Sequence, residues 1–383
     1  MSATVSRAGG PALVPFLDLR APYLEQQSDL DAALARVAAS GWYLLGEELR
    51  GFEAEWARYT ESAHAVGVAN GLDALHLALL ALDVGPGDEV IVPSNTYIAT
   101  WLAVSMTGAR PVPVEPDPAT YNIDPERIED AIGPRTRAIL PVHLYGLPAD
   151  MEPIREIAAR RGLRILDDAA QAHGARYRGE PVGALADATA WSFYPGKNLG
   201  AFGDGGAVTT DDDAIADRVR VLRNYGSRVK YVNEVRGFNS RLDDLQAAVL
   251  RVKLARLDEW NARRARAAAR YADALADLPL VLPAAPTYAT PSWHLYVVRT
   301  YEREALQSAL RARDVETLIH YPIPPHRQQA YAELDWPADA FPIANTIHDE
   351  ILSLPIGPHL TAEQQDRVTD AVAGHFARRG AAV

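Results

Sequence analysis

The chain has 383 residues, of which 48% are hydrophobic and 23% are charged, so it can bury a large core and is not intrinsically disordered. Its 50 Asp and Glu against 38 Lys and Arg give a formal net charge of -12, which argues against general affinity for nucleic acid and requires any bound anion to be held locally. The chain contains no cysteine, which excludes disulfides, thiolate zinc sites and a cysteine nucleophile.

The first residues of the chain show no targeting signal. Residues 1–15 contain a single Arg7 and no sustained apolar run, and no later segment has the uninterrupted apolar length of a membrane span. We therefore expect a cytoplasmic protein without a membrane partner.

Short apolar runs alternate with stretches of helical period between His64 and about Asp212, which is the pattern of a parallel sheet with crossover helices. The runs predict strands over residues 64–69, 89–93, 111–114, 138–142, 164–167, 188–193 and 206–210. The intervening stretches predict helices over residues 72–82, 96–106 and 151–162, with Gly108 and Gly162 as suitable stops. This part of the chain is predicted to be an α/β domain.

A long helix is predicted to begin near Ser240, which precedes Asp243 at the spacing of a capping box. The helical pattern continues until the proline-rich stretch 279–291. Beyond it, HLYVVRT, EREALQSALRARD and ETLIHYPIPP predict a strand, a helix and a second strand. We expect a large domain over residues 1–250 and a smaller α+β domain over residues 251–383.

The segment AWSFYPGKNLGAFGDGG, residues 190–206, runs from an apolar strand into a glycine-rich loop that contains one lysine, Lys197. A lysine at the end of a buried strand can lose its charge through desolvation and act as a nucleophilic amine. The alternative is a solvated surface lysine, and the loop by itself does not decide between the two.

The segment LDDAAQAHG, residues 166–174, ends a predicted buried strand in two carboxylates. Asp168 is placed to pair with a protonated ring nitrogen of a cofactor. Asp167 is expected to face elsewhere, because adjacent strand residues point to opposite faces. Either carboxylate could also cap a helix that begins at Ala169.

The segment VANGLDALHLALLAL, residues 68–82, predicts a strand, a tight turn at Asn70 and Gly71, and an immediate helix. The N-terminus of such a helix presents free N–H groups and a positive dipole end to a phosphate. This unit is common in α/β proteins, so it indicates little by itself. No GxGxxG fingerprint is present, which removes the main support for dinucleotide binding.

Together, Gly71, Leu72, Asp168, Ser192 and Lys197 resemble the motifs of the DegT/DnrJ/EryC1/StrS family of sugar aminotransferases. The resemblance covers nearly the whole chain, from FLDLRAPY through SFYPGKNLGAFGDGG to LSLPIGPHL. It implies the fold type I architecture, a mostly parallel seven-stranded sheet between helices with a smaller C-terminal α+β domain. It also implies pyridoxal 5'-phosphate as cofactor, with pyridoxamine phosphate as the half-reaction form, bound by the larger domain.

The resemblance assigns roles to these residues. It implies that Lys197 forms the internal aldimine and later transfers a proton, that Asp168 binds the pyridinium nitrogen, and that Ser192 contacts the phosphate. Gly71 and Leu72 supply the helix N-terminus to the same phosphate.

Three further cofactor contacts follow from the resemblance. Tyr97 and Gln171 are expected beside the cofactor ring, although Tyr97 could be an ordinary core aromatic. Asn239 is expected to reach the phosphate of the neighbouring subunit's cofactor, which implies a homodimer with shared active sites. A helix cap is the alternative role of Asn239.

The segment TLIHYPIPPH concentrates His320, Tyr321 and His326 among prolines, and it resembles the region that lines the sugar pocket in nucleotide-sugar aminotransferases. His294 is expected nearby, although a histidine at a strand start is more often structural. These histidines do not have the HExxH spacing, so no metal site is predicted.

The motifs look most like those of enzymes that aminate C-3 of a TDP-3-keto-6-deoxyhexose in deoxyaminosugar and antibiotic biosynthesis, with L-glutamate as the implied donor. Amination at C-4 of a TDP-4-keto-6-deoxyhexose is the alternative. Sugar dehydratases of the family carry histidine in place of the lysine, and Lys197 argues against that activity. Cysteine desulfurases need a cysteine, which the chain lacks. A non-catalytic regulator that binds the cofactor is the remaining alternative.

Overall fold

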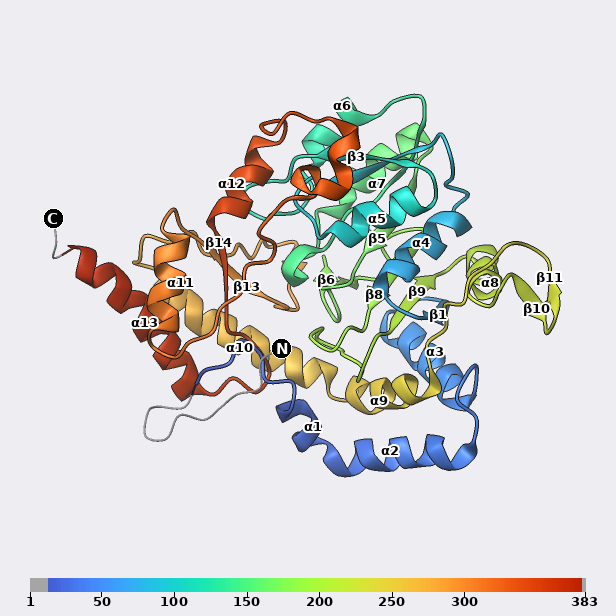
Figure 1. Cartoon of the computed structure of the whole chain (residues 1–383), viewed down its shortest axis with the longest axis horizontal. Coiled ribbons are helices and arrows are strands. Elements are labelled where there is room, and N and C mark those ends of the chain that lie inside the picture. The colour runs from blue at the N-terminus through green and yellow to red at the C-terminus, as the bar shows by residue number, and fades with distance from the viewer. Residues whose placement is uncertain (1–12, 381–383) are drawn as a thin grey trace.

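The computed structural model describes residues 13–380 and places seven strands in one central sheet, in the order β1-β9-β8-β5-β4-β2-β3 (Figure 1). These strands are β1 (His64–Val68), β2 (Glu89–Pro93), β3 (Arg110–Val114), β4 (Thr136–Ile139), β5 (Arg164–Asp168), β8 (Ala188–Ser192) and β9 (Gly206–Thr210). Only β9 runs antiparallel to its neighbours in this sheet. The predicted mostly parallel, seven-stranded sheet is confirmed, and each predicted strand overlaps an observed one.

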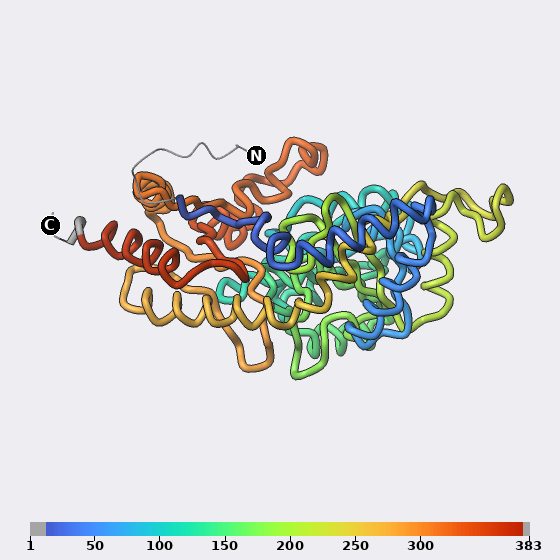
Figure 2. Tube along the Cα trace, turned by 90° about the horizontal axis from the view of Figure 1, so that it is seen from below, coloured from blue at the N-terminus to red at the C-terminus, as the bar shows by residue number. Residues whose placement is uncertain are grey.

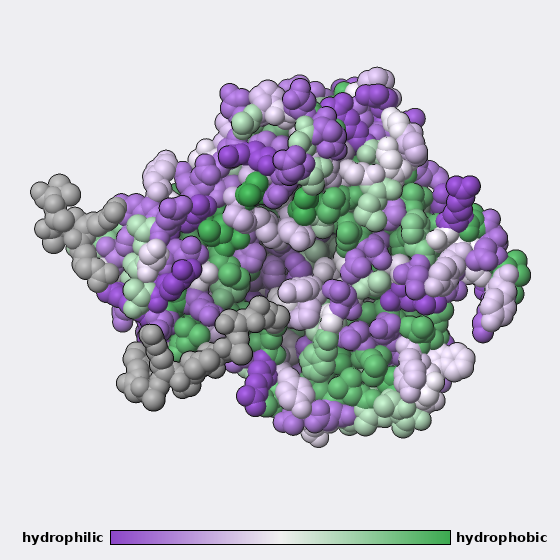
Figure 3. All heavy atoms as spheres, in the orientation of Figure 1, coloured by the Kyte–Doolittle hydropathy of each residue, from purple (hydrophilic) through white to green (hydrophobic). Residues whose placement is uncertain are grey.

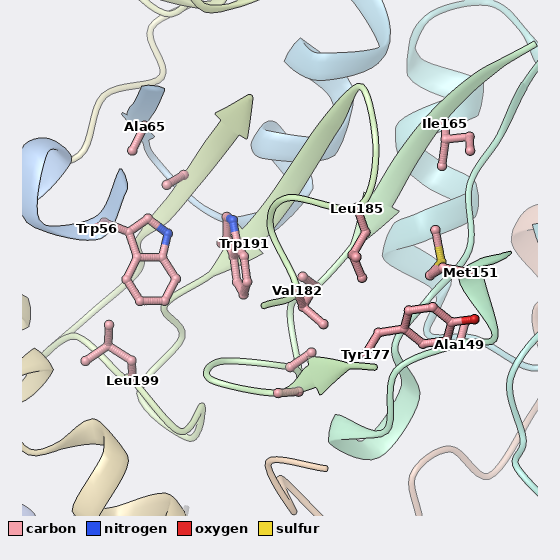
Figure 4. Packing of buried hydrophobic residues seen from close by; sticks show 14 of the residues in the cluster. Trp56, Ala65, Ala149, Met151, Ile165, Tyr177, Val182, Leu185, Trp191 and Leu199 are labelled. Atoms are coloured by element: carbon pink, nitrogen blue, oxygen red, sulfur yellow. The ribbon is translucent and has the colours of Figure 1, made fainter. Parts of the chain in front are cut away.

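Helices cover both faces of the sheet. One face carries α4 (Gly71–Ala81), α5 (Ile98–Met106) and α8 (Asp213–Leu222), and the other carries α3 (Glu47–Tyr59), α7 (Met151–Arg161) and α9 (Asp244–Leu254). Successive strand residues point to opposite faces, so Val90 and Ile91 enter different cores. In the core shown in Figure 4, Trp56 of α3 packs edge-on against Trp191 of β8, with ring centroids 5.0 Å apart.

Two elements lie outside these layers. The helices α1 (Ala21–Glu25) and α2 (Gln27–Ser40) form an outer layer, and α2 packs on α9. The hairpin of β10 (Ser227–Val229) and β11 (Val232–Asn233) projects from the body of the molecule, as Figures 1 and 2 show.

The start of α9 differs from the prediction. The helix begins at Asp244, and its N-cap residue Asp243 makes no side-chain capping bond. The hydroxyl of Ser240 instead accepts the N–H of Ala69 at the end of β1, so the predicted capping box is wrong. The carboxylate of Asp244 accepts the N–H groups at the start of α3, which ties α3 to α9. The helical pattern is also interrupted after Leu254 and resumes in α10 (Leu257–Leu275).

The C-terminal part of the chain forms a separate apolar cluster around a small antiparallel sheet. The elements of this part of the chain are β13 (Tyr296–Arg299), α11 (Arg303–Arg311), α12 (Pro342–Glu350), β14 (Ile351–Leu354) and α13 (Ala362–Gly380). Apart from α12, all of them contribute to the cluster, as does α10. The predicted strand and helix at β13 and α11 are confirmed. The second predicted strand, in ETLIHYPIPP, is wrong, because this segment makes only an isolated bridge at Leu318 and its prolines cannot donate to a ladder.

Apart from 3-10 turns, the remaining elements are short. They are α6 (Ile128–Ala131) and the three-stranded sheet of β6 (Arg176–Tyr177), β7 (Glu180–Pro181) and β12 (Ala289–Thr290). Val14, near the start of the described chain, belongs to the C-terminal apolar cluster. The division into domains at residue 250 stays a prediction. Among the described helices, none has both the length and the apolar character required to cross a membrane.

Candidate active site

A cavity of about 1230 Å³ lies at the carboxyl ends of β1, β2, β5 and β8, the edge at which α/β sheets bind ligands. The predicted site residues in its wall are Gly71, Leu72, Tyr97, Asp168, Gln171, Ser192, Lys197, His320 and Tyr321. These residues come from four connections of the sheet and from the segment after α11. Two predicted residues, Asn239 and His326, are not in the wall.

Asp168 is the last residue of β5, and both of its carboxylate oxygens are held. Oδ2 accepts the hydroxyl of Thr100 at 2.9 Å, and Oδ1 accepts the N–H of Ala170 at 3.1 Å. Burial raises the pKa of Asp168, while these hydrogen bonds and the charge of Lys197 oppose the rise. No helix begins at Ala169, so Asp168 orders a turn. A buried, oriented carboxylate of this kind suits a protonated ring nitrogen.

Lys197 lies in the turn after β8, where its backbone N–H donates to the carbonyl of Tyr194 at 2.8 Å. Its side chain is half-buried and faces the cavity. Desolvation lowers the pKa of its amine to about 8, and the nearby carboxylate of Asp168 acts in the opposite direction. Lys197 is therefore not a solvated surface lysine, and a fraction of its amine is neutral near physiological pH.

The N-terminus of α4 and the hydroxyl of Ser192 form a polar end of the cavity. Asn70 caps the helix by accepting the N–H of Asp73 at 2.9 Å. The N–H groups of Gly71 and Leu72 have no acceptor among residues 13–380. A Cβ atom on Gly71 would lie 2.6 Å from Cβ of Ser192, so only glycine permits this approach. Free N–H groups at a helix N-terminus beside a hydroxyl fit a phosphate.

Tyr97 and Gln171 connect the sheet to the segment after α11. Tyr97 is 50% exposed, and its ring centroid lies 4.8 Å from that of Tyr321. Nε2 of Gln171 donates to the Tyr321 hydroxyl at 2.9 Å, and Oε1 accepts the N–H of Tyr145 at 2.6 Å. Tyr97 is therefore not a core aromatic. Together with Asp168, Lys197 and the N-terminus of α4, these side chains fit the ring and the phosphate of pyridoxal phosphate.

The predicted substrate histidines separate in the structure. His320 lines the cavity, its Nδ1 lies 2.9 Å from the Ser353 hydroxyl, and burial lowers its pKa to about 4. His326 lies outside the wall because the chain turns into a 3-10 helix after Pro324 and packs the His326 ring 4.9 Å from the ring of Phe341. The expectation that His326 contacts the substrate therefore has no support in the fold.

Asn239 is exposed, and its backbone forms a bridge with Asn224. It does not contribute to the cavity of its own chain. Its expected contact with the cofactor of a partner subunit stays a prediction.

The sequence reasoning missed several residues around the site. Thr100 lies in the first turn of α5, and its hydroxyl lies 2.9 Å from that of Thr96, which precedes the helix. The spacing of four residues between the two threonines is the sequence signal that could have indicated this contact. Asn198, directly after Lys197, is buried, and its Oδ1 lies 3.2 Å from Nδ1 of His294 in the cavity wall. Tyr145 carried no sequence signal, because its role arises from a backbone contact with a residue distant in the chain.

Comparisons with known proteins agree with this geometry. A family model described as the DegT/DnrJ/EryC1/StrS aminotransferase family matches residues 25–373. A relative from Streptomyces venezuelae named dTDP-3-amino-3,4,6-trideoxy-alpha-D-glucose transaminase is 60% identical over 96% of this chain and 97% of its own. A relative from Aneurinibacillus thermoaerophilus named dTDP-3-amino-3,6-dideoxy-alpha-D-galactopyranose transaminase is 54% identical over 94% of this chain and 99% of its own.

A third relative has a different kind of name. The erythromycin biosynthesis sensory transduction protein EryC1 of Saccharopolyspora erythraea is 60% identical over 93% of this chain and 97% of its own. Among solved structures, S. venezuelae DesV in complex with a ketimine intermediate has a TM-score of 0.94 and 59% identity, and the match covers 95% of this chain and 98% of that chain.

Proposed function

The chain belongs to the DegT/DnrJ/EryC1/StrS aminotransferase family, and we propose that it moves the amino group of L-glutamate to C-3 of a TDP-3-keto-6-deoxyhexose in deoxyaminosugar biosynthesis. It is a pyridoxal-phosphate-dependent enzyme, as its family is. The observation that carries the proposal is the arrangement of Lys197, Asp168 and the N-terminus of α4 around one cavity.

Different side chains of this cavity perform different steps of a transamination. When bound, the cofactor withdraws electrons from the carbon that carries the amino group. Asp168, fixed by Thr100 and Ala170, keeps the ring nitrogen protonated and thereby strengthens that withdrawal. Nζ of Lys197 moves the proton between the two carbons that exchange the amino group, and a pKa of about 8 allows this amine both to accept and to release it.

The choice of C-3 over C-4 rests on the relatives. Two of them, at 60% and 54% identity, have names that describe 3-amino sugars. Amination at C-4 stays the alternative, because the 3-keto and 4-keto sugars differ only in which carbon of the hexose ring carries the carbonyl group.

A regulatory role is the second candidate function, since one relative at 60% identity is named a sensory transduction protein. A regulator that only binds the cofactor has no physical need for a desolvated lysine or for a carboxylate held on both oxygens. The cavity of this chain has both features, which supports catalysis over regulation.

The experiment that tests the function follows the visible absorption of the protein loaded with pyridoxal phosphate. We expect L-glutamate to bleach the yellow band and a 3-keto-6-deoxyhexose nucleotide to restore it, while the 4-keto isomer leaves it bleached. Recovery with only the 4-keto isomer would assign C-4. A band indifferent to glutamate would refute the aminotransferase proposal.

We also propose that the active unit is a homodimer in a cytoplasmic setting. The projecting hairpin of β10 and β11 exposes Val229, Tyr231 and Val232, and Figure 3 shows hydrophobic side chains at its end. Asn239 is exposed where this excursion returns to the body of the molecule. Sedimentation of the cofactor-loaded protein should give a dimer, and an active monomer would refute this proposal.

A further inference from the structure

Asn198, the residue after Lys197, has an amide whose orientation is fixed by its neighbours. Its Nδ2 donates to the backbone carbonyl of Ser292 at 2.8 Å and to Oδ1 of Asn261 at 2.9 Å. A backbone carbonyl only accepts, so it identifies the NH₂ end of the amide. Asn261 is fixed in the same way, because its Nδ2 donates to the backbone carbonyl of His173 at 2.8 Å.

This orientation determines the tautomer of His294. Oδ1 of Asn198 lies 3.2 Å from Nδ1 of His294, and since this oxygen can only accept, Nδ1 must carry the hydrogen. In a neutral imidazole the other nitrogen, Nε2, then has an unprotonated lone pair. Burial, together with the positive charges of Lys197 and Arg264, holds the pKa of His294 well below its usual value, so the ring is neutral.

The lone pair of His294 is available to a ligand. His294 is 9% exposed and lines the cavity that contains Lys197. Within residues 13–380, Nε2 of His294 has no hydrogen-bond partner. The backbone on either side is held in place, because Arg264 donates to the carbonyls of Trp293 and His294 at 3.2 Å. The structure thus presents a fixed, neutral acceptor to the cavity.

We propose that His294 binds the keto sugar by accepting a hydrogen bond at Nε2 from one of the sugar hydroxyl groups. This inference rests on the proposed function. Of the two substrates, the sugar brings free hydroxyl donors, whereas glutamate, whose amino group is engaged in the transfer itself, offers carboxylates that only accept and are repelled by a lone pair. His294 therefore discriminates in favour of the sugar half-reaction and leaves the glutamate half-reaction to other groups.

Two substitutions test the two ring nitrogens of His294 separately, Nδ1 at its buried end and Nε2 at its cavity end. In His294→Asn the amide reaches the position of Nδ1 and can still donate to Asn198, but nothing replaces Nε2. In His294→Gln the amide reaches the position of Nε2 and supplies an acceptor there, at the expense of the bond to Asn198. Each variant thus keeps one of the two hydrogen-bonding roles of His294 and loses the other.

The test uses the cofactor-loaded protein and measures each half-reaction by single-turnover absorbance, together with the melting temperature. We expect His294→Asn to slow the sugar half-reaction about tenfold or more, to change the glutamate half-reaction less than twofold, and to melt near the wild type. His294→Gln should retain more of the sugar half-reaction although it is less stable.

Three outcomes would overturn the inference. They are a normal sugar half-reaction in His294→Asn, an equal loss of both half-reactions, which would indicate an effect through Lys197, and activity that follows melting temperature across the pair. A wild-type protein that does not respond to glutamate would instead refute the proposed function, so the two failures are distinguishable.

Discussion

Replacement of Gly71 by alanine tests the phosphate end of the cavity most directly. The added Cβ would lie 2.6 Å from Cβ of Ser192 and 3.2 Å from its Cα, whereas ordinary contacts begin at 3.4 Å. The N-terminus of α4 and the end of β8 must therefore separate by about 0.8 Å. Such a shift moves the free N–H groups of Gly71 and Leu72 away from the Ser192 hydroxyl. Because charge-assisted hydrogen bonds depend strongly on geometry, we expect the Kd for pyridoxal phosphate to rise about 10- to 100-fold.

The assay is a titration of the apoprotein with pyridoxal phosphate, followed by absorbance, with the melting temperature of the apoprotein measured in parallel. Gly85→Ala is the matched control, because its Cβ would meet no atom within 4 Å. The control should bind the cofactor as the wild type does. A Kd for Gly71→Ala within twofold of the wild-type value would refute the assignment of this helix N-terminus to the phosphate.

Three further predictions concern Lys197, Thr100 and His348. Lys197→Ala should abolish turnover and leave the circular dichroism spectrum unchanged, and full activity in this variant would contradict its role. Thr100→Val removes the hydroxyl that donates to Oδ2 of Asp168 and thereby raises the pKa of Asp168 further. We therefore expect kcat/KM to fall about tenfold. An unchanged kcat/KM would show that Ala170 alone orients the carboxylate. Burial lowers the pKa of His348 to about 4 from 6.5, so between these pH values the unfolded state binds more protons and the unfolding free energy falls with falling pH. His348→Gln should make this dependence shallower in urea titrations, and an unchanged slope would contradict the assignment.

The sheet could be predicted because its signal is local. Each of its strands is a short apolar run bounded by polar or turn residues, and alternation of buried faces requires only the residue order. Asp167 illustrates this, because it points away from Asp168 as expected and lies fully buried with its carboxylate 3.3 Å from Nε2 of His143. The wrong predictions concern residues whose hydrogen bonds are made with partners distant in the chain. Ser240 resembles a helix cap, but its hydroxyl accepts from the N–H of Ala69, directly after β1, and no local pattern reveals that contact.

The residues of the candidate site also fall into those that a local sequence pattern indicates and those whose surroundings depend on distant residues. Asp168 ends β5 and Lys197 lies in the turn after β8, both in recognisable segments, and parallel strands bring their carboxyl ends to one edge. His326 lies outside the cavity of its own chain, because the turn after Pro324 directs its ring toward Phe341, whereas its neighbours suggest an extended segment. Its contact with the substrate stays a prediction. His294 looked like an ordinary structural histidine, since the sequence does not show which of its nitrogens is occupied by Asn198.

An acidic chain can bind a phosphate because the site does not depend on a cluster of positive side chains. Lys197 and Arg311 are the lysine and arginine of the cavity wall, against the carboxylates of Asp168, Asp204, Asp314 and Glu316. With a formal net charge of -12, the protein as a whole repels anions at long range, and this repulsion is screened by salt within about 10 Å. At the N-terminus of α4 the backbone N–H groups act over hydrogen-bond distances, where screening is weak. Because neutral donors hold the phosphate at this position, Lys197 is not needed as its counter-ion, and its amine can change protonation without loss of the phosphate contacts. The separation of phosphate binding from proton transfer follows from the glycine that opens α4 and from the lysine in the turn after β8.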